Sequence, residues 1–120
     1  MTEDKLYLTH IAECIERVEE YTTDGRRAFL NDHRTQDAVL RNLQVLAEST
    51  QRLSDECRAT RTEVDWRGIA GFRNFLVHGY LGVDILRVWD VASNDLPGLK
   101  THITEMLAEL QSEPDEHAPT

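Results

Sequence analysis

The sequence lacks the features of a disulfide-stabilised, metal-binding or membrane protein. Its two cysteines, Cys14 and Cys57, lie in amphipathic stretches, far apart and without Cys/His ligand spacing, so we expect two reduced, packed thiols. No apolar run approaches the roughly 18 residues of a membrane span. The acidic start, residues 1–5, has no signal-peptide core. These absences predict a cytoplasmic protein without a membrane partner.

Positive charge is also scarce. The chain has 13 Lys and Arg against 22 Asp and Glu, and its net charge of −9 argues against a protein that coats nucleic acid nonspecifically. A local patch can still differ in sign from the whole, because basic residues cluster in two stretches: Arg26, Arg27, His33, Arg34 and Arg41, and then Arg52, Arg58 and Arg61. The charge is therefore compatible with an RNA-cleaving enzyme that has a basic groove.

What the chain does have is helical periodicity. Its 120 residues suit one domain with a single core. No segment alternates with period two, and apolar residues recur at helical spacing in five stretches: Leu8, Ile11, Ile15 and Val18; Val39, Leu43, Leu46, Thr50, Leu53 and Cys57; residues 69–77; residues 85–91; and Leu99, Ile103, Met106 and Leu110. We predict an all-α, up-and-down bundle of about five helices over residues 1–111, followed by a disordered acidic tail over 112–120.

Turn and cap residues predict where these helices begin and end. Thr23-Asp24-Gly25 ends the first helix, and Asp65 caps a helix over about 66–77. Asp84 caps the next helix, and Ser93-Asn94-Asp95-Leu96-Pro97 forms a turn that opens the last, with the proline in its first turn. The helix over 66–77 is apolar around most of its circumference, which predicts a central position.

One short segment carries chemistry. Residues 73–80, Arg-Asn-Phe-Leu-Val-His-Gly-Tyr, form the pattern Arg-x-x-x-x-His-x-Tyr. Arginine presents a charged fork of donors that suits phosphate, and histidine gives or takes a proton near neutral pH. The intervening glycine lets the backbone leave the helix. These are the minimum parts for cutting a phosphodiester bond without a metal. The remaining histidines lack the spacing of metal ligands: His10, His33, His102 and His117.

A wider set of segments stands in a specific order along the chain. They are Tyr7-Leu8-x-His10-Ile11, Thr35-Gln36-Asp37-Ala38-Val39, Arg41-Asn42-Leu43, Val64-Asp65-Trp66-Arg67-Gly68-Ile69-Ala70-Gly71, the 73–80 motif, Gly82-Val83-Asp84, Val88-Trp89 and Asp95-Leu96-Pro97. In this order the chain resembles HepT-type proteins of the HEPN superfamily of small helical ribonucleases, over almost the whole domain. It departs from the family at Ala47-Glu48-Ser49, where members often carry Gly-Glu-Ala.

The resemblance implies a homodimer in which two copies of the motif face one cleft at the subunit interface. It implies metal-independent RNA cleavage without a cofactor, on a target such as tRNA or mRNA, by the toxin of a toxin–antitoxin pair of the type VII kind. The partner would be a minimal nucleotidyltransferase antitoxin, which in this family can transfer AMP from ATP onto the motif tyrosine, here Tyr80.

The resemblance also assigns catalysis to Arg73 and His78. His78 would be the general acid or base for attack by the ribose 2′-hydroxyl, leaving a 2′,3′-cyclic phosphate, and Arg73 would bind the phosphate. The alternatives are a histidine that only ends a helix and an arginine in a structural salt bridge with an acid such as Glu48. Positions five apart do not share a helix face. The two side chains therefore converge only if the helix ends near Gly79, or if both subunits contribute to the cleft.

Three further residues are candidates for the site. Asn74 could orient His78 or the phosphate, and an exposed helix asparagine is the alternative. Tyr80 could position RNA and would be the site of AMPylation, which blocks RNA by volume and like charge; otherwise it packs a helix corner. Arg41 shares a face with Glu48, seven positions later, and could contact RNA in the cleft, although a structural role is favoured for both.

Two other functions compete with the ribonuclease toxin. One is a noncatalytic HEPN-fold adaptor that only binds and presents a nucleotidyltransferase, and the other is an ordinary helical dimer with no nucleic-acid role. The intact Arg-x-x-x-x-His-x-Tyr motif favours the enzyme, because an adaptor has no need of that combination.

Overall fold

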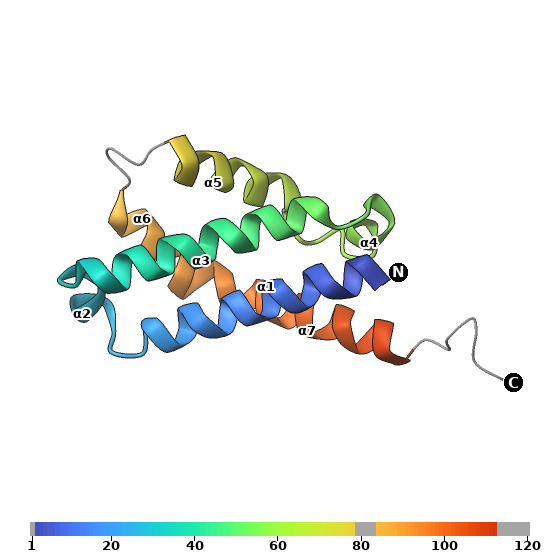
Figure 1. Cartoon of the computed structure of the whole chain (residues 1–120), viewed down its shortest axis with the longest axis horizontal. Helices are drawn as coiled ribbons and strands as arrows, with labels where there is room; N and C mark the ends of the chain where they lie inside the picture. The colour runs from blue at the N-terminus through green and yellow to red at the C-terminus, as the bar shows by residue number, and fades with distance from the viewer. Residues whose placement is uncertain (1, 79–83, 113–120) are drawn as a thin grey trace, which may run out of the picture.

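The computed structural model describes residues 2–78 and 84–112, and this part of the chain is helical and contains no strand. In chain order its helices are α1 (Thr2–Tyr21), α2 (Arg26–Leu30), α3 (His33–Arg52), α4 (Asp55–Ala59), α5 (Trp66–His78), α6 (Ile85–Asp90), the π-helical η1 (Val91–Asp95) and α7 (Leu96–Ser112). The long helices run in alternating directions along the molecule (Figure 1). The predicted all-α, up-and-down bundle is therefore confirmed. Apart from Ser112, the predicted tail lies outside the described residues.

The core lies between α1, α3 and α7. The α1 and α3 helices pack along their length, α7 lies against α1, and α5 packs mainly on α3 (Figure 1). Most of the predicted apolar stripes are buried: Leu8, Ile11, Ile15 and Val18 from α1, Val39, Leu43 and Leu46 from α3, and Ile103 and Met106 from α7. Leu99 and Leu110, the other members of the α7 stripe, are half-buried. Full burial of such an aliphatic side chain contributes about 1.5–3 kcal/mol, so these stripes are a major source of the stability of the fold.

The turn between α1 and α3 is fixed by its own side chains. Gly25 has a φ of 94°, a conformation that favours glycine, as the predicted end of the first helix requires. Asp32 caps α3 by accepting hydrogen bonds from the backbone N–H groups of Arg34 and Thr35. The buried Gln36 side chain donates to the carbonyl of Phe29 at 3.0 Å and so anchors α2 against α3.

The second long helix ends earlier than its apolar pattern predicts. We expected one helix through Cys57, but α3 stops at Arg52, and Ser54 begins the separate short helix α4. The cause is a contact with α1: the buried Asp4 carboxylate accepts the Ser54 N–H at 2.8 Å and the Ser54 hydroxyl at 2.7 Å. Ser54 Oγ in turn accepts the N–H of Cys57 at 3.1 Å and caps α4.

The turn predicted at residues 93–97 is wrong, although α7 begins at Leu96 with Pro97 in its first turn, as predicted. Residues 85–112 form a continuous helix in which η1 joins α6 to α7. The Leu96 N–H donates to the carbonyl of Val91, five residues earlier, which is the π-helical pattern. A proline inside a helix removes a bond and crowds the carbonyl four residues before it. The wider π turn in front of Pro97 lets the helix pass the ring without breaking.

The position predicted for the motif helix is also wrong. Although α5 begins after Asp65 as expected, with the Gly68 N–H donating to Asp65 Oδ1 at 2.9 Å, it lies at the edge of the bundle and not at its centre (Figure 1). Leu76 is its buried residue in the described part, while Ile69, Phe72 and Phe75 are half-buried. An apolar circumference therefore does not mark a core helix here, because one flank of α5 has no helix against it within the part of the chain that the structure describes.

Candidate active site

Arg73 and His78 both lie on α5, which remains helical through His78. An α-helix turns about 100° per residue, so the two positions are about 140° apart around the axis. Because the helix does not end before His78, the two positions do not share a face of one chain. The side chain of His78, together with Gly79 and Tyr80, lies outside the described residues. The predicted roles of His78 and Tyr80 therefore stay predictions.

Arg73 is held beside an acid on α3. Its Nη2 lies 3.7 Å from Glu48 Oε1, and its Nη1 donates to Asn74 Oδ1 at 3.4 Å. The Nε atom is buried and has no hydrogen-bond partner among the described residues. The side chain as a whole is 34% exposed. The salt bridge weighed above is thus present, yet the guanidinium keeps donor capacity for a phosphate.

Glu48 is itself oriented by a residue that the sequence did not single out. Gln44, one helical turn earlier on α3, donates from Nε2 to Glu48 Oε1 at 3.2 Å. The Glu48 side chain is 38% exposed. The spacing of four residues was the available signal for this pair, but such a spacing is common on any helix surface, so it gave no reason to choose Gln44.

Arg41 and Asn74 have different positions in the site. Asn74 is exposed and contacts Arg73, so the structure brings these two predicted residues together. Arg41 is exposed on α3 and makes no ion pair within residues 2–78 and 84–112. It shares a face with Gln44 and Glu48, so these three residues form a polar stripe on α3.

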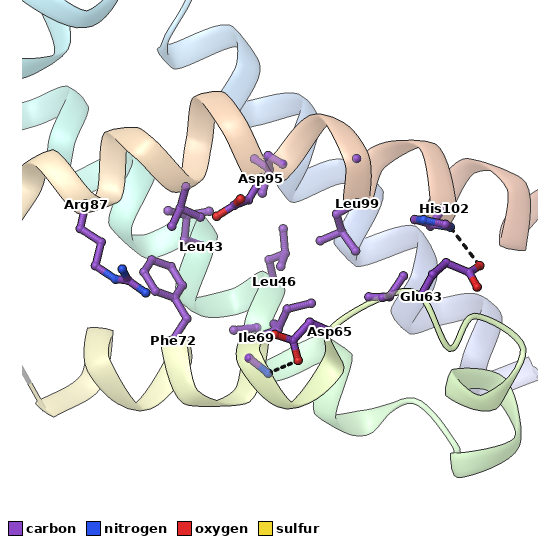
Figure 2. Close-up of a pocket in the computed structure, with 16 residues that line it drawn as sticks. Leu43, Leu46, Glu63, Asp65, Ile69, Phe72, Arg87, Asp95, Leu99 and His102 are labelled. Atoms are coloured by element: carbon purple, nitrogen blue, oxygen red, sulfur yellow. Dashed lines mark hydrogen bonds and ion pairs between the residues drawn. The ribbon is translucent and has the colours of Figure 1, made fainter.

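A cavity of about 440 Å³ opens elsewhere, between α3, α5 and the helix formed by α6, η1 and α7 (Figure 2). Its floor is apolar and includes Leu43, Leu46 and Ile69, while Arg87 and His102 stand toward opposite ends. Neither Arg73 nor Asn74 lines it. The cavity shows how little of α5 is covered by α7.

One end of this cavity is closed by the loop that precedes α5. Arg61 pairs with Glu109 of α7, and His102 Nδ1 lies 3.7 Å from Glu63 Oε1 (Figure 2). The Trp66 indole N–H also donates to the carbonyls of Arg58 and Arg61, both at 3.0 Å. These contacts fix the loop and therefore the direction in which α5 starts.

Neither the thiols nor any cluster of metal-ligand side chains forms a second site within the described residues. Burial raises the pKa of both Cys14 and Cys57, which lowers their thiolate content and agrees with packed, unreactive thiols. Among the described residues no three His, Cys, Asp or Glu side chains gather as ligands for a metal ion. In the same part of the chain, no helix is long and apolar enough to cross a membrane.

Several known proteins are similar to this chain over most of its length. The family model described as "Ribonuclease HepT-like" matches residues 11–106. The chain is 38% identical over 97 residues to a protein of Thermococcus cleftensis named "Probable ribonuclease HepT", covering 80% of this chain and 88% of that protein. It is 33% identical over 105 residues to a protein of Caldanaerobacter subterraneus named "Putative RNase", covering 84% and 91%.

A longer relative carries a second activity in its name. It is a protein of Methanocaldococcus jannaschii named "Gamma-glutamylcyclotransferase and putative RNase", 37% identical over 107 residues. The match covers 88% of this chain and 48% of that protein, so the chain spans about half of its length. None of the solved structures matches this chain significantly.

Proposed function

Because the chain belongs to the ribonuclease HepT-like family, we propose that it is a metal-independent endoribonuclease and the toxin of a type VII-like toxin–antitoxin system. The observation that carries the proposal is the Arg73 guanidinium, which is positioned on α5 by Glu48 and Asn74 yet retains a buried Nε without a partner. A half-exposed arginine with unused donors is suited to a phosphate group. The names of the relatives, which are RNases, support RNA as the substrate.

In this proposal the motif residues divide the work. Arg73 binds the scissile phosphate and stabilises the charge that develops on its oxygens. His78 transfers a proton during attack by the ribose 2′-hydroxyl, which gives a 2′,3′-cyclic phosphate and a 5′-hydroxyl. Asn74 holds the guanidinium, Arg41 contacts the RNA backbone from the polar stripe, and Tyr80 orients the RNA.

The active form in this proposal is a homodimer. Arg73 and His78 lie about 140° apart around α5, so a cleft that combines residues of two copies brings an arginine and a histidine together more readily than one copy does. The half-buried Phe72 and Phe75, which stack with ring centroids 5.7 Å apart, lie on the same helix. A second copy that covers them would bury apolar surface that α3 leaves open.

The antitoxin in this proposal is a minimal nucleotidyltransferase that transfers AMP to Tyr80. An adenylyl group adds a bulky anion two residues from His78, which would exclude RNA from the cleft by volume and by like-charge repulsion. Intact mass measured after incubation with the antitoxin and ATP tests this step. One or more adducts of AMP on the wild type and none on Tyr80→Phe is the expected result.

The first experiment is cleavage of labelled total RNA and bulk tRNA by the purified, unmodified protein in EDTA. We expect products with 2′,3′-cyclic phosphate ends, and loss of cleavage in Arg73→Ala and in His78→Ala. Glu13→Ala, which removes an exposed acid of α1 far from the motif, is the matched control and should cleave like the wild type. Equal cleavage by all variants would identify a contaminating nuclease and remove the motif from the mechanism.

The noncatalytic adaptor is the second candidate, and the existing Arg73–Glu48 pair favours it to a limited degree because a structural role for the arginine needs no RNA. The adaptor predicts no cleavage by any form, no adduct on Tyr80, and a stable complex with the nucleotidyltransferase that survives His78→Ala. The same cleavage and mass measurements therefore separate the two functions.

A further inference from the structure

Cleavage through a 2′-hydroxyl needs two proton transfers. The attacking 2′-oxygen loses a proton, and the departing 5′-oxygen gains one. In an in-line displacement these oxygens lie on opposite sides of the phosphorus, so the base and the acid must approach from opposite sides. The motif offers His78 for one of these transfers, and a second group is needed near the arginine that holds the phosphate.

We propose that Glu48 is this second group, the general base that receives the proton of the 2′-hydroxyl. The inference rests on the proposed ribonuclease function and names a catalytic residue outside the Arg-x-x-x-x-His-x-Tyr motif. Glu48 is the acid that the structure places against Arg73, with 3.7 Å between Oε1 and Nη2. A phosphate bound to Arg73 would bring the adjoining ribose to this carboxylate.

The contacts of Glu48 leave one oxygen ready for such a role. Oε1 accepts the hydrogen bond from Gln44 at 3.2 Å and faces Arg73. Within the described residues Oε2 accepts no hydrogen bond, and the side chain is 38% exposed. One oxygen therefore fixes the orientation of the carboxylate, while the other can reach a substrate hydroxyl.

Charge distinguishes this role from simple support of Arg73. A carboxylate beside a phosphate-binding arginine partly neutralises the guanidinium and repels the phosphate. A neutral acceptor such as a glutamine would hold the guanidinium without that cost. What the carboxylate adds is the capacity to accept a proton, which a glutamine lacks.

The proposed step balances in atoms and charge. Glu48 takes the proton from O2′ as O2′ bonds to phosphorus, the bond between phosphorus and O5′ breaks, and O5′ takes a proton from the imidazolium of His78. The products are the 2′,3′-cyclic phosphate and the 5′-hydroxyl. Glu48 is then protonated and His78 neutral, and exchange with water restores both.

A substrate with an activated leaving group distinguishes the general base from the general acid, because its leaving group departs without a proton. The p-nitrophenyl ester of uridine 3′-phosphate forms the same cyclic phosphate but releases p-nitrophenolate, which needs no proton. We expect Glu48→Gln to lower kcat by about 100-fold or more on both bulk tRNA and the ester. His78→Ala should be equally slow on tRNA but recover most of its activity on the ester. Glu13→Gln is the matched control, and thermal melting checks that each variant is folded.

Two results would overturn the assignment of Glu48. If Glu48→Gln keeps a near-normal kcat on tRNA while Glu48→Ala loses it, the residue only supports Arg73. If His78→Ala stays inactive on the ester while Glu48→Gln cleaves it, the histidine is the base. Should the wild type leave the ester untouched, the comparison of Glu48→Gln with Glu48→Ala on tRNA decides alone. Failure of the proposed function looks different, because the wild type would then cleave no RNA.

Discussion

Asp4 is a buried carboxylate whose function is structural. It accepts two hydrogen bonds from Ser54 and thereby joins the first turn of α1 to the break between α3 and α4. Hydrogen bonds to a charged group contribute about 1.5–3 kcal/mol each. We expect Asp4→Ala to lower the free energy of unfolding by about 2–4 kcal/mol in urea titrations. Glu13→Ala is the exposed control, and equal midpoints for the two variants would contradict this role for Asp4.

We expect the same substitution, glycine to alanine, to have different effects on stability at Gly98 and at Gly68. A Cβ on Gly98 would meet no heavy atom within 4 Å, whereas a Cβ on Gly68 would lie 2.2 Å from the Oδ2 of Asp65. Gly98→Ala should therefore raise the free energy of unfolding by about 0.5–1 kcal/mol through helix propensity. Gly68→Ala should gain nothing, because the new methyl group displaces the capping carboxylate, which costs about 0.5–2 kcal/mol.

The measurement for this pair is the shift in Tm of each variant against the wild type. Both positions are exposed and lie in helices, so they differ chiefly in the neighbouring carboxylate. An equal rise in Tm for both variants would mean that Asp65 does not cap α5 in solution.

Asp32 should make the free energy of unfolding depend on pH in the acid range. Hydrogen bonds from the Thr35 hydroxyl, the Thr35 N–H and the Arg34 N–H lower the pKa of Asp32 below its ordinary value. A lowered folded-state pKa adds stability above the unfolded pKa of about 3.9 and loses it as the pH falls through the folded value. Asp32→Asn keeps a cap but does not titrate.

The check is urea unfolding of the wild type and Asp32→Asn between pH 6 and pH 2. We expect the difference in stability between the two proteins to hold from pH 6 to about pH 5 and then to fall as the carboxylate is protonated. A difference that stays constant down to pH 2 would show that the hydrogen bonds of Asp32 are not specific for its charged form.

At the scale of helices, the π-helical η1 segment contains one residue more than an α-helical turn, and we attribute this extra residue to Pro97. Deleting Ser93 should restore a plain α-helix, since one extra residue distinguishes a π turn from an α turn. The ring of Pro97 would then crowd the carbonyl four residues before it. We expect the deletion alone to cost about 3 kcal/mol and the deletion combined with Pro97→Ala to recover most of it.

Urea unfolding of the single and double variants, beside Pro97→Ala alone, measures this coupling. If the Ser93 deletion is as stable with the proline as without it, the π segment does not exist to accommodate Pro97. Ser93 is a suitable position for the deletion, because it is exposed and, among the described residues, its hydroxyl donates only to the Trp89 carbonyl, one helical turn earlier, at 2.8 Å.

The helices could be predicted where their signals are local. Periodicity marked the stripes of α1, α3 and α7, and Gly25, Asp65 and Asp84 marked ends through bonds to residues only a few positions away. The break at Ser54 could not be predicted, because it depends on Asp4, fifty positions earlier. The η1 segment was missed because Asn-Asp-Leu-Pro has the composition of a turn.

The candidate site was predictable to a similar extent. Arg73 was recognisable from the motif, and Glu48 as an acid of the second long helix with which it could form a salt bridge; the structure joins them. The edge position of α5 could not be predicted, because a helix that is apolar all round fits a core and a subunit interface equally well. Gln44 had no sequence signal beyond its spacing from Glu48.

At the scale of the whole molecule, mixing two inactive variants tests where each site is built. If Arg73 of one copy works with His78 of the other, a heterodimer of Arg73→Ala and His78→Ala contains one site with both mutations and one intact site. Random exchange of equal amounts gives half heterodimers, so activity should return to about a quarter of the wild type.

The control for mixing is each variant incubated alone under the same exchange conditions. Both should remain inactive. No recovery in the mixture, with exchange verified by native mass spectrometry, would mean that Arg73 and His78 act within one chain. Recovery would show that the dimer is part of the catalytic machinery and is not only a way to cover α5.

The pairing of α1 with α3 also sets an order of events during synthesis. The contacts between these two helices, and the bond that the Ser54 N–H donates to Asp4, are available once the first 54 residues have left the ribosome. The motif on α5 emerges later and docks on a helical hairpin that can already have closed. A nascent chain of this protein therefore acquires its scaffold first, including Glu48 on α3, and Arg73 and His78 on α5 join it only afterwards.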